Sequence, residues 1–164
     1  MDTTAQKLSA ILSIDIPELS FTGESEEEAS LIEACHNIIQ TSAHEQGGDL
    51  VKAIGDSFLL SFSNCKEAVT CALDIKEKLK ATKTSSRAPT LRARMGIHLG
   101  DVGFFGKNIF GEAVDIASAL QAVAAPGSLC VSGEVLSLVR ETMSLNAKPF
   151  TGQRQRTLPP GIQA

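Results

Sequence analysis

The sequence has no tryptophan and no tyrosine, and its seven phenylalanines bring the aromatic share to only 4%. Proteins that bind single-stranded nucleic acid stack bases on aromatic rings, so this composition argues against that class. The charge balance argues the same way, because 19 acidic residues outnumber 15 basic residues and give a net charge of −4. We therefore expect no nucleic acid among the partners.

No hydrophobic run approaches the roughly 18 apolar residues that a membrane-spanning helix needs. The first residues, Met1-Asp2-Thr3-Thr4, do not resemble a signal peptide, and no basic cluster suggests contact with a lipid surface. We expect no direct membrane insertion and a cytoplasmic location, either for the chain alone or as the cytosolic domain of a larger protein.

Cysteine motifs are also missing, because the four cysteines show no CxxC spacing and no histidine at the spacing of a metal site. What is present is a hydrophobic share of 43% in 164 residues, enough for one domain with a real core. We expect the cysteines to be small core residues in a reducing compartment: Cys35, Cys65, Cys71 and Cys130.

Hydrophobic periodicity and turn residues predict the order of strands and helices. The first helix begins at a capping box, Ser25 with Glu28, and ends before Gly47-Gly48. The strands are predicted at 8–16, at 49–62 as a strand, turn and strand, at 91–98, at 100–107 as a hairpin arm, at 129–132 and at 145–150; the helices at 25–45, from Ser63 or Asn64 to about 80, from Gly111 to Pro126, and at 134–140. This order is that of an α+β, ferredoxin-like βαββαβ antiparallel sheet with helices on one face and with an added helix and strands.

Two aspartates stand at positions where strands end. Asp56 follows Gly55 between two apolar segments, which is typical of a tight hairpin tip, and Asp15 ends the first strand. A carboxylate at such a tip is often only a turn residue. If the two strands pair, however, the two like charges meet at one edge of the sheet, and a cation between them is favoured. Two carboxylates together with substrate phosphates are a common way to hold Mg²⁺.

Three segments of the chain resemble the class III nucleotidyl cyclase catalytic domain, the family of adenylate and guanylate cyclases, over about Leu8 to Gly161. Ser13-Ile14-Asp15-Ile16 resembles its first metal strand, and Gly47 to Phe58 resembles its second. The third segment, Met95 to Gly100 followed by Asn108 to Ser118, resembles the strand and helix that carry its base-recognition and transition-state residues. One such motif alone would be weak, but three in order are specific.

The resemblance implies a reaction in which the ribose 3′-oxygen of ATP or GTP attacks the α-phosphorus and pyrophosphate leaves. It implies two divalent ions, Mg²⁺ or Mn²⁺, held by Asp15 and Asp56 with help from the backbone carbonyl of Ile16. Lys52 matches the base-reading lysine, and Asn108 matches the residue that selects adenine or guanine. Ser20 keeps a hydroxyl at the end of the phosphate-binding turn.

The chain departs from the family at its transition-state residues. Asp115 stands where the family has an asparagine that orients the ribose, and Ala119 stands where it has an arginine for the charge on the phosphorane. In the phosphate-binding turn, Pro17 lacks a backbone N–H and Glu18 adds negative charge. These changes predict weak activity.

The departures leave two functions open, a weak cyclase and an inactive cyclase-homology domain that senses nucleotide or mediates dimerisation in signalling. A diguanylate cyclase is disfavoured, because Gly47-Gly48-Asp49-Leu50 precedes a strand instead of forming a hairpin tip. The family resemblance implies a homodimer in which Lys52 and Asn108 of one chain face Asp15 and Asp56 of the other. It also implies that residues 1–164 are a single domain truncated before the family's last strand.

Overall fold

A six-stranded mixed sheet forms the centre of the molecule, with the strand order β2-β3-β1-β4-β5 and with β6 parallel to β4. The computed structural model describes residues 5–19, 26–82, 90–106 and 108–143. The strands are β1 (Ala5–Asp15), β2 (Asp49–Ile54), β3 (Ser57–Phe62), β4 (Arg94–Phe105), β5 (Asn108–Phe110) and β6 (Leu129–Val131). The helices are η1 (Pro17–Leu19), α1 (Glu26–Glu45), α2 (Cys65–Ala81), α3 (Glu112–Val123) and α4 (Gly133–Arg140). Among the described helices, none has the length and apolar character that a bilayer crossing requires.

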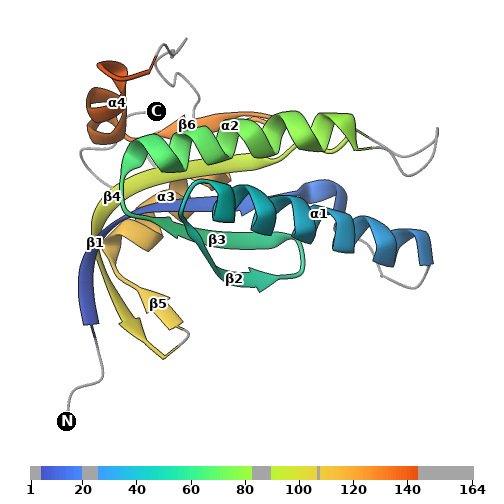
Figure 1. The fold of residues 1–164 in the computed structure, drawn as a ribbon, viewed down its shortest axis with the longest axis horizontal. Helices are drawn as coiled ribbons and strands as arrows, with labels where there is room; N and C mark the ends of the chain where they lie inside the picture. The colour runs from blue at the N-terminus through green and yellow to red at the C-terminus, as the bar shows by residue number, and fades with distance from the viewer. Residues whose placement is uncertain (1–4, 20–25, 83–89, 107, 144–164) are drawn as a thin grey trace.

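The predicted βαββαβ order is confirmed. Figure 1 shows α1 and α2 side by side over one face of the sheet, and α4 packs against α2 and β4 on the same side. The local signals for these elements are also confirmed. The Asn64 side chain caps α2 by accepting a hydrogen bond from the Glu67 N–H at 2.9 Å, and Gly55 has the positive φ of +58° that the hairpin turn requires.

The helix α3 corrects the expectation that all helices cover one face, because it lies on the opposite face against β4 and β1. Gly96 on β4 permits this close approach: a Cβ at that position would lie 2.3 Å from the Ala117 carbonyl oxygen and 2.4 Å from the Gln121 nitrogen. The backbone of α3 therefore rests almost directly on the strand.

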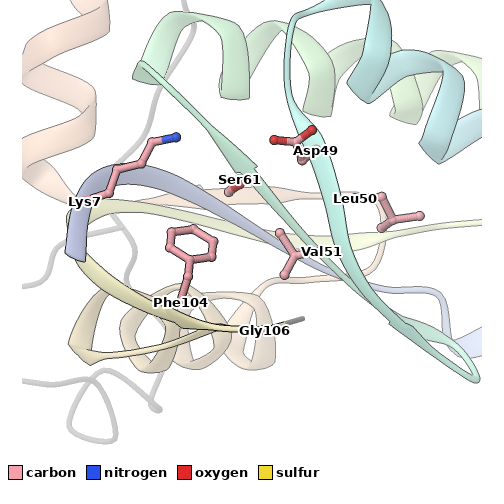
Figure 2. A pocket seen from close by; sticks show the side chains of 7 residues that line it. All are labelled: Lys7, Asp49, Leu50, Val51, Ser61, Phe104 and Gly106. Carbon is pink, nitrogen blue, oxygen red and sulfur yellow. The ribbon is translucent and has the colours of Figure 1, made fainter. Parts of the chain in front are cut away.

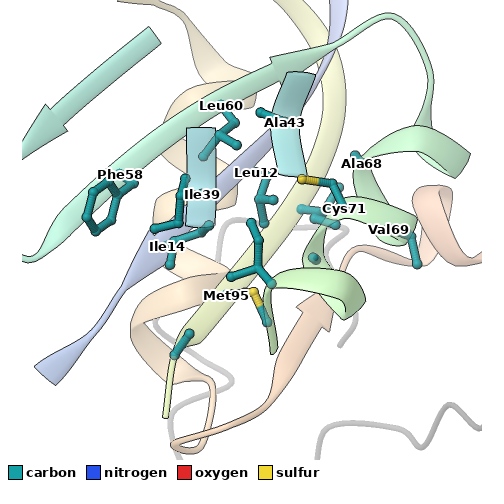
Figure 3. Close-up of a cluster of buried hydrophobic side chains, with 14 of the residues drawn as sticks. Leu12, Ile14, Ile39, Ala43, Phe58, Leu60, Ala68, Val69, Cys71 and Met95 are labelled. Atoms are coloured by element: carbon teal, nitrogen blue, oxygen red, sulfur yellow. The ribbon is translucent and has the colours of Figure 1, made fainter. Parts of the chain in front are cut away.

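The larger of the hydrophobic clusters lies between the sheet and the pair α1 and α2 (Figure 3). Leu12 and Ile14 project into it from β1, whereas Ile11 projects to the other face and packs with Val102 under α3. The predicted burial of the cysteines is confirmed, since all four thiols are buried and free. Burial raises the pKa of Cys65 to about 11 and that of Cys71 to about 12, which keeps both thiols protonated and unreactive.

The prediction of a strand at 91–98 and a separate hairpin arm at 100–107 was wrong. A single strand, β4, runs from Arg94 to Phe105. It pairs with the whole length of β1, from Asp15 opposite Arg94 to Ala5 opposite Phe104. Because β1 is long, its pairing with β4 continues through Gly100, where the sequence predicted a break between two strands. The predicted strand at 145–150 and the Ser25 cap lie outside the described residues.

Candidate functional site

The pairing of β1 with β3 brings Asp15 and Asp56 to the same edge of the sheet. Asp15 lies opposite Ser57, and the N–H of Ile16 donates to the backbone carbonyl of Asp56 at 2.9 Å. Asp56 is half-buried in the turn between β2 and β3, and its Oδ1 accepts a hydrogen bond from the Ser57 hydroxyl at 3.4 Å. The edge thus carries two carboxylates from segments about forty residues apart in the chain.

The donor set at this edge fits a hard divalent ion whose remaining ligands come from elsewhere. Among the described residues, no group of three or more His, Cys, Asp or Glu side chains is placed to hold a metal. Mg²⁺ is commonly bound through one or two carboxylates with substrate phosphates and water supplying the rest. Asp15 and Asp56 match that pattern better than they match a metal site built only from protein ligands.

The turn after β1 differs from the expectation in one respect. The Ile16 carbonyl, predicted to assist a metal, accepts a hydrogen bond from the Leu19 N–H at 2.9 Å, so one of its two lone pairs is engaged. Glu18 accepts from the backbone N–H of Arg92 at 2.8 Å and lies 3.8 Å from the Arg92 Nε. The negative charge of Glu18 is therefore compensated by Arg92. Ser20 lies outside the described residues.

Arg94 is a site residue that the sequence reasoning missed. It stands directly opposite Asp15 in the β1–β4 pairing, and its Nη2 donates to the Asp15 Oδ2 in a charge-assisted hydrogen bond. The only sequence signal was the alternation of Arg92 and Arg94 with Ala93 and Met95 within the strand predicted at 91–98. Recognising its role required the register between two strands, since the two residues are 79 positions apart.

Lys52 lines a hollow of about 290 Å³ on the α3 side of the sheet. A bulge at Val51, between Leu50 and Lys52, shifts the pairing with β3 and so sets the direction of the lysine. The other lining residues come from β1, β2, β3, β5 and α3: Ser13, Ile54, Ser57, Phe58, Leu59, Ile109, Val114, Ser118 and Gln121. The strand predicted to read the base (β2) and the helix predicted to carry the transition-state residues (α3) therefore line the same hollow.

The predicted residues Asn108, Asp115 and Ala119 do not line this hollow, although each is adjacent in the chain to a lining residue. Asn108 is exposed at the start of β5, opposite Phe105, and directly precedes the lining residue Ile109. On α3, Asp115 is exposed in the first turn and Ala119 is half-buried one turn later, next to the lining residue Ser118. Of the predicted site residues within the described ranges, the structure thus places Lys52 alone in the lining of this cavity, and Asp15 lies two residues after the lining residue Ser13 on β1.

A second hollow, of about 590 Å³, lies near the other end of β1 (Figure 2). Lys7 borders it from β1, Phe104 from β4 and Asp49 from β2, with Leu50, Val51, Ser61 and Gly106 completing the lining. None of these lining residues is a predicted site residue. The chemistry predicted from the sequence belongs to the smaller hollow and to the aspartate edge.

Comparison with known proteins shows the family of the chain. A family model described as the adenylate and guanylate cyclase catalytic domain matches residues 9–155. A Rhizobium meliloti protein named "Putative adenylate cyclase 3" is 27% identical over 137 residues, which are 80% of this chain and 23% of that protein. The chain spans about a quarter of the length of the first curated relatives it matches.

Solved structures show the same fold. An adenylate/guanylate cyclase/hydrolase from Silicibacter pomeroyi superimposes with a TM-score of 0.80 at 27% identity, covering 98% of this chain and 95% of that one. The adenylyl cyclase CyaB from P. aeruginosa superimposes with a TM-score of 0.82 at 23% identity, covering 98% of this chain and 93% of that one.

Proposed function

Because the chain belongs to the family of adenylate and guanylate cyclase catalytic domains, we propose that it is a nucleotidyl cyclase that forms a 3′,5′-cyclic nucleotide and pyrophosphate from ATP in preference to GTP. The observation that carries this proposal is the hydrogen bond between Ile16 and the Asp56 carbonyl, which sets two carboxylates at one sheet edge. The name of the Rhizobium meliloti relative supports ATP as the substrate.

In the proposed reaction, a bond forms between the ribose 3′-oxygen and the α-phosphorus, and the bond from the α-phosphorus to the bridging oxygen of pyrophosphate breaks. Asp15 and Asp56 would hold two ions, Mg²⁺ or Mn²⁺. Such ions, when bound, lower the charge on the phosphates and favour the deprotonated 3′-oxygen. The contribution of the protein is to present both carboxylates in one fixed arrangement before substrate arrives.

The base would bind in the Lys52 hollow. The lysine ammonium supplies a hydrogen-bond donor for a ring acceptor, and the amide of Asn108 offers both a donor and an acceptor. The apolar side chains of Ile54 and Ile109 provide the flat contact that a purine ring needs. The same amide can serve adenine or guanine, so base selectivity is expected to be modest.

We propose that the site is completed by a second copy of the chain. The strands β2, β4 and β5 expose large hydrophobic side chains, with Ile54 63%, Phe105 54% and Phe110 46% exposed. Exposed large apolar side chains are found on surfaces that a partner covers. In a two-fold homodimer, Lys52 and Asn108 of each chain would serve the aspartates of the other. The four free, buried cysteines are compatible with a cytoplasmic location.

The test is to measure binding of ATP and GTP in the presence of Mn²⁺, together with cyclic nucleotide production. Asp56→Ala is expected to abolish both, because one carboxylate alone would supply too little negative charge to hold the ions. Asp101→Asn, which removes an exposed carboxylate from β4, is the matched control and should leave both unchanged.

Unaltered activity of Asp56→Ala would contradict the metal role of the hairpin. A wild-type protein that binds neither nucleotide at millimolar concentration would favour the other function considered, a cyclase-homology domain that only mediates dimerisation.

A further inference from the structure

The contact between Arg94 and Asp15 occupies a carboxylate that the proposed function assigns to a metal ion. The Asp15 side chain is 13% exposed and the Arg94 side chain 29% exposed, so water screens their attraction only in part. The contact is built into the sheet, because the two residues lie opposite each other where β1 and β4 pair. It is therefore expected to form in every folded molecule that lacks a metal.

The contact leaves the guanidinium incompletely satisfied. Arginine binds a carboxylate most strongly through two parallel N–H donors. Here the Nη2 reaches the Asp15 Oδ2, while the Nε of Arg94 is buried and has no hydrogen-bond partner among the described residues. The Nε of Arg94 has lost its hydration without gaining a hydrogen bond. The guanidinium is therefore easier to displace from Asp15 than one held by two hydrogen bonds.

A second acid close in sequence to Asp15 is already engaged by another arginine. Glu18, on the turn that follows β1, accepts a hydrogen bond from the Arg92 N–H at 2.8 Å. Arg92 precedes β4 by two residues and Arg94 is the first residue of β4, and each has its own carboxylate. The pair of Arg92 with Glu18 is a structural contact. The pair of Arg94 with Asp15 lies at the proposed metal edge.

We propose that Arg94 is an internal counter-ion of Asp15, and that a divalent ion binds at this edge by exchange with the guanidinium. The proposal rests on the proposed function, which places a metal at Asp15 and Asp56. Without a cation, two carboxylates at one edge repel each other. Arg94 relieves that repulsion in the metal-free protein, and the same charge repels an incoming ion, so Arg94 sets the metal affinity and acts as a positioning residue.

The experiment titrates Mn²⁺ alone, without nucleotide, into the whole chain and follows the free ion by electron paramagnetic resonance. Arg94→Gln removes the charge and keeps a hydrogen-bond donor, and it is expected to tighten Mn²⁺ binding at least about tenfold. Arg94→Lys keeps the charge and should remain close to wild type. Arg92→Gln removes the same charge two residues away and should change the affinity less than about twofold.

A second measurement uses the wild-type protein and does not depend on a variant that folds. On titration with Mg²⁺, the side-chain Nε–H resonance of Arg94 should shift with the same concentration dependence as the backbone resonances of Asp15 and Asp56. A resonance of Arg94 that stays unchanged while the aspartates report binding would overturn the exchange.

The outcomes separate the two proposals. Mn²⁺ binding that is equal or weaker in Arg94→Gln contradicts the exchange and leaves the proposed metal site intact. Absence of Mn²⁺ and Mg²⁺ binding in the wild type and in Arg94→Gln alike contradicts the metal site, and the exchange with it.

Discussion

Ala119 is the residue that most limits the proposed chemistry. Charge develops on the phosphoryl oxygens in the transition state, and arginines that stabilise such charge in other phosphoryl-transfer enzymes contribute roughly 10³–10⁵ in rate. An alanine side chain supplies no charge. Asp115, one turn earlier on the same helix, adds a negative charge that opposes the approach of a triphosphate. Binding should suffer less than turnover, because Lys52 and the metal edge are retained.

The combined substitution Ala119→Arg and Asp115→Asn should raise cyclic nucleotide production at least about tenfold, which is ~1.4 kcal/mol of barrier. The expected cause is recovery of charge stabilisation at the α-phosphate, so kcat should increase more than KM changes. Ala122→Arg, which adds an arginine at an exposed position of the same helix, is the matched control. Rapid turnover by the wild type, with no gain from the double substitution, would show that another residue supplies the missing charge.

The strand β4 links the candidate site to the rest of the molecule. Its α3-side positions include Gly96, which admits the backbone of α3, and His98, which is 8% exposed. The His98 Nδ1 lies 2.7 Å from the Ser132 Oγ, and the same Oγ accepts the Val135 N–H at 3.4 Å as the cap of α4. The Ser132 hydroxyl thus contacts both the His98 ring and the first turn of α4.

The burial of His98 predicts a pH dependence of stability. Burial lowers the pKa of His98 below its ordinary value of about 6.5, although the charges of Glu134 and Glu112 act in the opposite direction. As the pH falls through about 6.5, His98 takes up a proton in the unfolded chain but remains neutral in the folded chain. The stability contributed by neutral His98 is complete above that pH, and it is lost as the pH falls from about 6.5 through the pKa of the folded state.

Urea unfolding at pH 7.5 and pH 5.5 measures this contribution. The wild type should lose more free energy of unfolding over this interval than His98→Gln, in which the titrating group is gone. His36 and His44 are present in both proteins and cancel in the comparison. An equal loss in both proteins would mean that His98 titrates alike in the folded and unfolded states.

At the scale of the whole molecule, Lys52 and Asp56 belong to one hairpin but are proposed to serve different active sites. A homodimer with two equivalent sites makes a specific prediction for mixtures of inactive variants. Asp56→Ala and Lys52→Ala should each be inactive alone. When the two are mixed in equal amounts and allowed to exchange subunits, half of the dimers contain one intact site, so about a quarter of the wild-type activity should return.

The measurement is cyclic nucleotide production before and after mixing, with sedimentation velocity to follow assembly. Two portions of the same variant, mixed in the same way, provide the control and should stay inactive. No recovery together with a dimer in sedimentation would place Lys52 and Asp56 in the same site. A monomer at high protein concentration would remove the basis for sites shared between chains.

Local signals in the sequence were sufficient for most of the individual elements. Apolar spacing defined α1 and α2, and Gly55-Asp56 marked the hairpin turn, because helical periodicity and turn geometry depend on residues a few positions apart. Three motifs also identified the family, and with it the candidate roles of Asp15, Asp56 and Lys52. These roles remain proposals, while the family and the fold are confirmed.

Features that depend on long-range pairing became visible only in the folded molecule. The placement of α3 on the opposite face, the continuity of β4 through Gly100, and the contact of Arg94 with Asp15 all depend on which strands become neighbours and in which register. A shift of one residue in the β1–β4 register would turn every side chain of one strand to the other face and separate Asp15 from Arg94. Register is chosen by the burial of both sheet faces at once, and no local segment of the chain contains that information.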